Sequence, residues 1–130
     1  MPKQTLQVLT ETFSVHSFDH EQTVPPEVFA CPIYFISKTY DELSIVCPTS
    51  LKLDSIEHED NWIALEVLGP LGFSLTGILS NISGVLAAAN VSIFAISTFD
   101  TDYILVKKDS VATAIKVLRK DGYKVLTDAA

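Results

Sequence analysis

The 130-residue chain has little cysteine, the residue that cross-links small proteins through disulfides and often binds metals. Its two cysteines are too few for a disulfide framework, and Cys31 and Cys47 lack the spacing of metal ligands. We expect both to be buried as small apolar side chains. If residues 33–37 and 43–47 pair as a hairpin, Cys47 falls opposite Ile33, which makes the two thiols diagonal neighbours at best.

Charge is absent from residues 67–99. An uncharged run of this length can be a membrane span. However, glycine, proline and polar side chains divide it into pieces that are too short to cross a bilayer. The first 13 residues also lack the basic region and apolar core of a signal peptide. We therefore predict a cytoplasmic protein that does not enter a membrane.

Basic side chains are also scarce. Nine of them against sixteen acidic ones give a net charge of -7 and a pI near 4.7, so the chain repels phosphate backbones and nucleic acid is not an expected partner. Hydrophobic residues make up 48% and charged residues 19%, which is too apolar for a disordered chain. The composition predicts a folded protein of one domain or two very small ones.

Catalytic motifs are missing as well. Residues 72–76 approach the G-x-S-x-G pattern of a nucleophilic serine, but Thr76 replaces the last glycine and no histidine follows Ser74. His16 and His20 flank a predicted strand end and turn, where a spacing of four does not bring metal ligands together. No phosphate-binding lysine motif or dinucleotide-binding glycine pattern is present. We predict no enzymatic activity, no metal and no cofactor.

The second half of the chain has clear periodic patterns. Residues 62–68 alternate as a strand does, and a GPLG turn follows. From Phe73 the apolar residues recur at helical spacing to about Ala89, where Asn90 is suited to a left-handed cap. A hairpin is predicted next, from strands at residues 91–99 and 103–106. A second helix is predicted from residue 109 or 110 to its end at Gly122, and a last strand at residues 123–126. The order βαββαβ predicts an α+β, ferredoxin-like fold with helices on one face of an antiparallel sheet.

The first half is a weaker copy of this pattern. Strands are expected at residues 5–18, bent or bulged near Thr10, and at 33–37 and 43–47, with only a stub of helix at 26–30. Residues 50–61 are polar and are expected to be a connector. We therefore predict two domains, residues 1–60 and 61–130.

The predicted central helix has no charge on the side opposite its apolar stripe. That side carries small or neutral residues, namely Gly77, Ser80, Asn81, Gly84 and Ala88. The simple explanation is an uncharged polar surface. Burial against a second element explains it better, supplied either by the other half of the chain or by a second copy, and a homodimer with a two-fold axis is the commonest arrangement.

Two further features suggest a ligand. The predicted helix start at Gly72, Phe73 and Ser74 offers free amide groups to a carboxylate, although Ser74 also suits ordinary capping. Asp100 and Asp102 suit an ammonium or guanidinium group, although aspartate is also common in turns. An anion site and a cation site together match a free amino acid.

Residues 62–125 resemble an ACT domain, the amino-acid-sensing module of aspartokinases and other biosynthetic enzymes. The strings GPLGFSLTGIL and SIFAISTFDTDYILV are most similar to the small tandem-ACT proteins of the arginine-sensor kind, and DELSIVCP in the first half resembles their degenerate amino-terminal ACT-like unit. The resemblance implies a regulatory protein that binds its effector between paired ACT units. Carried over by position, the ligand-binding residues are Gly72, Phe73, Ser74, Val91, Ser92, Phe99, Asp100 and Asp102. GPLG departs from the Pro-Gly arrangement common in enzyme-linked ACT domains, which leaves the ligand open.

Three functions follow as hypotheses. The first is a free-standing amino-acid sensor that signals to a partner enzyme or signalling protein. The second is a dimerisation or scaffold module without a functional ligand site. The third is a small hydrolase or transferase using Ser74, which the missing motifs disfavour.

Overall fold

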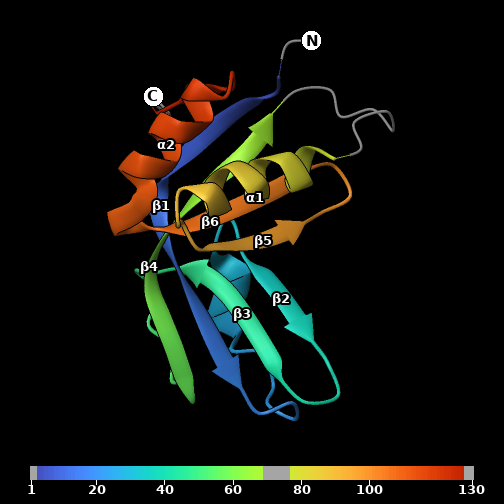
Figure 1. The fold of residues 1–130 in the computed structure, drawn as a ribbon. Helices are drawn as coiled ribbons and strands as arrows, with labels where there is room; N and C mark the ends of the chain where they lie inside the picture. The colour runs from blue at the N-terminus through green and yellow to red at the C-terminus, as the bar shows by residue number, and fades with distance from the viewer. Residues whose placement is uncertain (1–2, 69–76, 128–130) are drawn as a thin grey trace. The chain divides into compact units, whose positions relative to one another are not determined.

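The structure, a computed structural model, describes residues 3–68 and 77–127 and combines helices with a largely antiparallel sheet (Figure 1). The strands are β1 (Thr5–Phe18), β2 (Phe35–Lys38), β3 (Leu43–Pro48), β4 (Glu57–Leu68), β5 (Ile93–Ser97), β6 (Asp102–Lys107) and β7 (Lys124–Leu126). The helices are η1 (Pro26–Ala30), α1 (Ile78–Ala88), η2 (Lys108–Ser110) and α2 (Val111–Lys120), of which η1 and η2 are 3-10 helices. The strand order is β2-β3-β1-β4-β6-β5, with β7 paired to β1. The predicted α+β fold class is confirmed.

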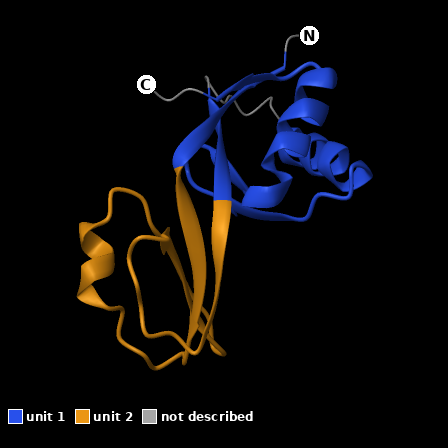
Figure 2. Cartoon of the chain, turned by 90° about the vertical axis from the view of Figure 1, so that its left-hand side faces the viewer, with its two compact units in different colours: residues 1–10, 63–130 blue, residues 11–62 orange. Residues whose placement is uncertain are grey.

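The chain forms two compact units (Figure 2). Unit 1 comprises Met1–Thr10 and Ile63–Ala130, and unit 2 comprises Glu11–Trp62. The long strands β1 and β4 each contribute residues to both units. The division into domains 1–60 and 61–130 stays a prediction.

Unit 1 contains the predicted βαββαβ order in β4, α1, β5, β6, α2 and β7. Both α-helices cover the same face of its sheet (Figure 2), and their apolar stripes meet the strands in one core. Core residues from both α-helices and four strands are buried, among them Leu6, Leu65, Leu86, Ile104, Leu118 and Val125. Leu6 belongs to this core because Thr5–Gln7 of β1 pair in parallel with Lys124–Leu126, a pairing that the sequence did not predict.

Helix α1 begins later than predicted. Ile78 is its first residue, and the preceding Gly77 is left-handed, with φ +88°. A residue in that conformation interrupts a right-handed helix, so the helix predicted from Phe73 to about Ala89 is not continuous through Gly77. The predicted start at Phe73 lies outside the described residues. At 11 residues α1 is short, and none of the helices in residues 3–68 and 77–127 is long and apolar enough to cross a membrane.

The ends of both α-helices are confirmed. Asn90 is left-handed, with φ 61°, and the Val91 amide donates to the Leu86 carbonyl at 2.9 Å. Gly122 is left-handed at the end of α2, with φ 102°, and the Tyr123 amide donates to the Leu118 carbonyl at 3.0 Å. These backbone bonds satisfy helix carbonyls that would otherwise lack a donor.

In unit 2, β3 pairs antiparallel with both β1 and β2. Phe35 lies opposite Val46, so the predicted register, with Ile33 opposite Cys47, is wrong by one residue. The predicted connector 50–61 is wrong at its end, because Glu57–Asn61 are part of β4. Charged residues suit this part of β4 because it is an edge strand of the sheet in unit 2, and edge strands commonly carry charged side chains.

The cysteines differ in burial. Cys47 is completely buried in the small core of unit 2, as expected, whereas Cys31 is only partly buried, contrary to expectation. Burial, with a smaller effect of Cys31, raises the pKa of the Cys47 thiol to about 11. Cys47 is therefore protonated at neutral pH and behaves as an apolar core residue.

The two hairpins turn in the same way. The β2–β3 turn reads Thr-Tyr-Asp-Glu over residues 39–42, and the β5–β6 turn reads Thr-Phe-Asp-Thr over residues 98–101. In each, the first threonine amide donates to the fourth carbonyl, at 2.9 and 2.8 Å respectively. The threonine hydroxyl accepts a backbone N–H in both turns, and the second residue is an exposed aromatic. Each hairpin thus presents an aromatic side chain on an ordered turn.

Candidate functional site

The candidate site lies in unit 1 where β4 ends and the β5–β6 hairpin turns. The Thr101 hydroxyl donates to the Val67 carbonyl at 2.5 Å, which joins the turn to the end of β4. Thr98 fixes the turn from the other side, since its hydroxyl donates to the Thr101 carbonyl at 3.1 Å. The turn is therefore held close to the carboxyl-terminal end of β4.

Three carboxylates are located at this end of the sheet. Asp102 starts β6 opposite Ser97 and accepts a hydrogen bond from its hydroxyl at 2.6 Å. Asp100 is exposed in the turn. Glu66 of β4 accepts a hydrogen bond from the Tyr103 hydroxyl at 3.2 Å. We define these three residues as the acidic end of unit 1.

Tyr103 shows the electrostatic effect of this arrangement. Burial raises the pKa of its hydroxyl, and the negative charge of Glu66 with the hydrogen bond to it, together with Asp100, raises it further. The hydroxyl is therefore a stable donor at neutral pH. Asp102 and Tyr103 are consecutive in β6, so Asp102 points to the face covered by the helices, whereas Tyr103 and its partner Glu66 lie on the opposite face. A positive group bound beside Asp102 would meet a carboxylate that the Ser97 hydroxyl already orients.

The structure brings together only part of the predicted ligand-binding set. Phe99, Asp100 and Asp102 lie together at the acidic end, with Phe99 fully exposed at 102%. Val91 and Ser92 precede β5, and Val91 is buried against the end of α1. The five residues of β5 separate the two groups by roughly 16 Å at the usual rise per residue. Gly72, Phe73 and Ser74 lie outside the described residues.

Sequence reasoning missed several polar groups of this end. These are Glu66, Ser97, Thr101 and Tyr103. Glu66 carried a signal, because it is the only charged residue in the otherwise apolar strand pattern of residues 62–68. The other three became recognisable only once the register placed Ser97 opposite Asp102 and Ile96 opposite Tyr103.

The chemistry of this end is that of cation recognition. Its carboxylates can accept hydrogen bonds from an ammonium or guanidinium group, and the exposed Phe99 ring offers a face to a cation or an alkyl chain. Within residues 3–68 and 77–127, no group of three or more His, Cys, Asp or Glu side chains is arranged to hold a metal ion.

Comparison with protein families shows a match between residues 57–120 and the model of the ACT domain. The cytosolic arginine sensor for mTORC1 subunit 1 of Rattus norvegicus is 32% identical over 130 residues, covering 92% of this chain and 39% of the sensor. The Bos taurus protein of the same name is 44% identical over 78 residues, covering 58% and 23%. The chain thus spans well under half the length of these relatives.

Solved structures show the same fold. The crystal structure of a protein from Agrobacterium tumefaciens has a TM-score of 0.92 and 25% sequence identity, covering 100% of this chain and 97% of that one. Aspartate kinase from Clostridium acetobutylicum has a TM-score of 0.65 and 15% identity, covering 90% and 34%. The regulatory subunit of aspartate kinase from Thermus thermophilus has a TM-score of 0.64 and 7% identity, covering 90% and 97%.

Proposed function

We propose that this chain, which carries an ACT domain over residues 57–120, is a non-catalytic regulatory protein that binds a free amino acid. The observation behind this proposal is the Asp102 carboxylate at the start of β6, which the Ser97 hydroxyl orients next to the exposed Asp100 of the ordered β5–β6 turn. Hydrogen bonds to charged groups contribute about 1.5–3 kcal/mol each. A ligand with a cationic side chain therefore fits this end best.

The rest of the ligand requires donors for its carboxylate. We propose that Gly72, Phe73 and Ser74 supply backbone amides and a hydroxyl, because their segment follows β4 and Thr101 ties the turn to that strand. Val91 and Ser92 lie at the other end of β5. We propose that the Val91 and Ser92 which contact the ligand are those of a second ACT unit, so that the effector lies between two paired units.

A second copy is the proposed source of that unit. Ser80, Asn81, Gly84, Ala87 and Ala88 form an exposed, uncharged face of α1, which we call the small-residue face. A Cβ atom at Gly84 would meet nothing within 4 Å, so another helix can approach the backbone there. This supports a homodimer. It also supports the alternative function, a dimerisation module without a ligand.

The names of the relatives support a cytosolic location and a signalling or enzyme partner for this chain. The rat and bovine proteins are described as cytosolic arginine sensors, and the Clostridium and Thermus structures as an aspartate kinase and its regulatory subunit. We propose that amino-acid binding changes the association of this chain with such a partner.

Isothermal titration against the twenty common amino acids tests the binding. We expect heat with arginine or lysine, and we expect Asp102→Asn to weaken that binding by about tenfold to a hundredfold because it removes one charge-assisted interaction. Asp109→Asn is the matched control, since Asp109 is an exposed aspartate in η2, outside the candidate site. No heat with any amino acid, or equal affinities for Asp102→Asn and the wild type, would overturn the proposal. Self-association without any heat would favour the dimerisation module.

A further inference from the structure

Charge is divided unequally between the two units. Unit 2 has ten acidic and two basic side chains, a net charge of -8, whereas unit 1 has six acidic and seven basic side chains, a net charge of +1. The basic side chains of unit 1 concentrate on and beside α2, where Lys108, Lys116 and Lys120 are exposed. Lys116 and Lys120 are four residues apart and therefore lie on the same side of the helix. A molecule of net charge -7 thus presents a local basic surface.

An open groove lies beside these lysines. It has a volume of about 490 Å³ and runs between the carboxyl-terminal parts of α1 and α2. Its walls are Val85, Ala88, Ala89 and Val117, with Lys120 and Asp121 at the polar side. Asp121 is already paired, because its carboxylate accepts hydrogen bonds from Lys3 and, at 3.2 Å, from Asn81. Lys120 therefore dominates the charge at the mouth of an apolar groove.

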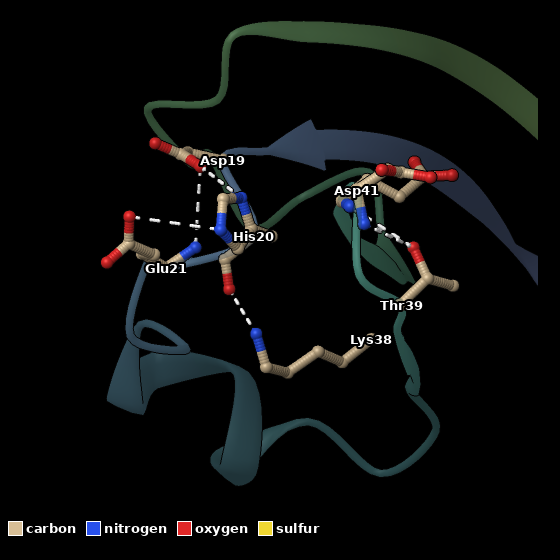
Figure 3. A network of polar contacts seen from close by, with 7 residues as sticks. Asp19, His20, Glu21, Lys38, Thr39 and Asp41 are labelled. Carbon is tan, nitrogen blue, oxygen red and sulfur yellow. Dashed lines mark hydrogen bonds and ion pairs between the residues drawn. The ribbon is translucent and has the colours of Figure 1, made fainter.

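The β2–β3 turn of unit 2 has the complementary chemistry. Tyr40 is 98% exposed at its tip and is followed by the exposed Asp41 and Glu42. The Thr39 hydroxyl accepts the Asp41 and Glu42 amides at 3.2 and 3.1 Å (Figure 3). An ordered turn loses little conformational entropy on binding, and tyrosine is among the residues that most often anchor interfaces.

The surroundings of this tip are also acidic. The ammonium group of Lys38 donates to the His20 carbonyl (Figure 3). Asp19 and Glu21 flank His20, and their carboxylates lie 2.9 and 3.8 Å from its ring nitrogens. The tip is therefore an exposed aromatic side chain within a group of carboxylates.

We infer that the Tyr40 tip of one copy inserts into the α1–α2 groove of a second copy, with Asp41 and Glu42 facing Lys116 and Lys120. Charge complementarity identifies the occupant, since the groove is basic and apolar and the same chain exposes an acidic aromatic finger. Two copies that exchange tips form a closed pair, while one-way insertion extends into a chain. The contact shares only Ala88 with the small-residue face of α1, and it does not depend on the proposed ligand.

Sedimentation velocity over a concentration series at low and high salt tests the inference. We expect association to weaken as salt rises, because complementary patches are screened. A contact through the uncharged face of α1 has the opposite expectation, since salt relieves the repulsion between two copies of charge -7. Tyr40→Ala and Lys120→Glu should each weaken association by about tenfold or more. Lys124→Glu and Phe29→Ala are the matched controls and should leave it unchanged.

The controls make the same chemical changes elsewhere. Lys124 alternates with the buried Val125 in β7, so it points away from the helices, and Phe29 is an exposed aromatic outside the turn. The decisive experiment measures association in a mixture of the Tyr40→Ala and Lys120→Glu variants. The Tyr40→Ala variant keeps an intact groove and the Lys120→Glu variant keeps an intact tip, so the tip of the second can bind the groove of the first. Recovered association in the mixture supports the inference. A monomer at all concentrations, association that strengthens with salt, or a mixture no better than its components overturns it.

Discussion

Two glycine-to-alanine substitutions in and beside α1 are expected to have opposite effects on stability. Gly77 precedes the helix with φ +88°, and Gly84 lies within it. A Cβ atom at either position would meet no atom of residues 3–68 and 77–127 within 4 Å, so neither substitution causes a steric clash with the described part of the fold. Only the backbone conformation distinguishes the two sites.

The expected magnitudes follow from that difference. An L-residue in the left-handed region costs about 1–2 kcal/mol, partly offset by about 0.4–1 kcal/mol from the stiffer unfolded chain, so Gly77→Ala should destabilise by about 1 kcal/mol. Alanine within a helix is favoured over glycine by about 1 kcal/mol, so Gly84→Ala should stabilise by that amount. The two variants should therefore differ by about 2 kcal/mol in their free energy of unfolding.

Urea denaturation followed by circular dichroism, at one low protein concentration, measures both values. The concentration is fixed because self-association would itself alter apparent stability. If the helix began near Phe73, as the sequence pattern predicts, Gly77 would be a helix-interior residue and Gly77→Ala would stabilise. A stabilising Gly77→Ala would therefore refute the helix start described here.

Three further predictions concern the cores and a buried histidine. Leu118→Ala should lower the free energy of unfolding by about 2–5 kcal/mol in the same assay, because Leu118 is completely buried in the core of unit 1, and a loss below 1 kcal/mol would contradict that packing. Burial, and to a smaller extent the nearby His58, lowers the pKa of His16 from 6.5, so the unfolded state takes up a proton before the folded state does. The free energy of unfolding should therefore fall as the pH drops below 6.5. His16→Gln should reduce this dependence on pH, and an unchanged dependence would contradict the reasoning. Cys31 should react with a thiol reagent faster than Cys47, whose burial and pKa of about 11 protect it until the protein unfolds, and equal rates in the folded protein would contradict this.

Periodic sequence patterns predicted elements whose partners are local. The sequence predicted three such features: the apolar stripe of α2, the helix caps at Asn90 and Gly122, and the β5–β6 hairpin. Each depends on residues that are close together in the chain. The start of α1 could not be predicted, because leucine and isoleucine at helical spacing continue across Gly77 while its backbone conformation changes.

Pairings between distant residues were not predictable from the pattern. Nothing in the sequence near Thr5 indicates that it pairs with Lys124, and residues 57–61 are all polar, so they lack the apolar–polar alternation that would have predicted the first part of β4. One of them, Asp60, accepts a hydrogen bond from Ser14 at 2.7 Å. The candidate site shows the same division: the turn residues Phe99 and Asp100 were predicted, whereas Glu66 required the strand arrangement.

The pairing of β7 with β1 has a consequence for the order of folding. Thr5 can pair with Lys124 only after almost 120 further residues have been synthesised, so the sheet of unit 1 is completed late. Unit 2 is one continuous segment, Glu11–Trp62, and can form during that interval. Until β7 is synthesised, Leu6 lacks part of its core and Thr5–Gln7 lack the parallel partner strand, and apolar surface and strand edges exposed in this way favour aggregation.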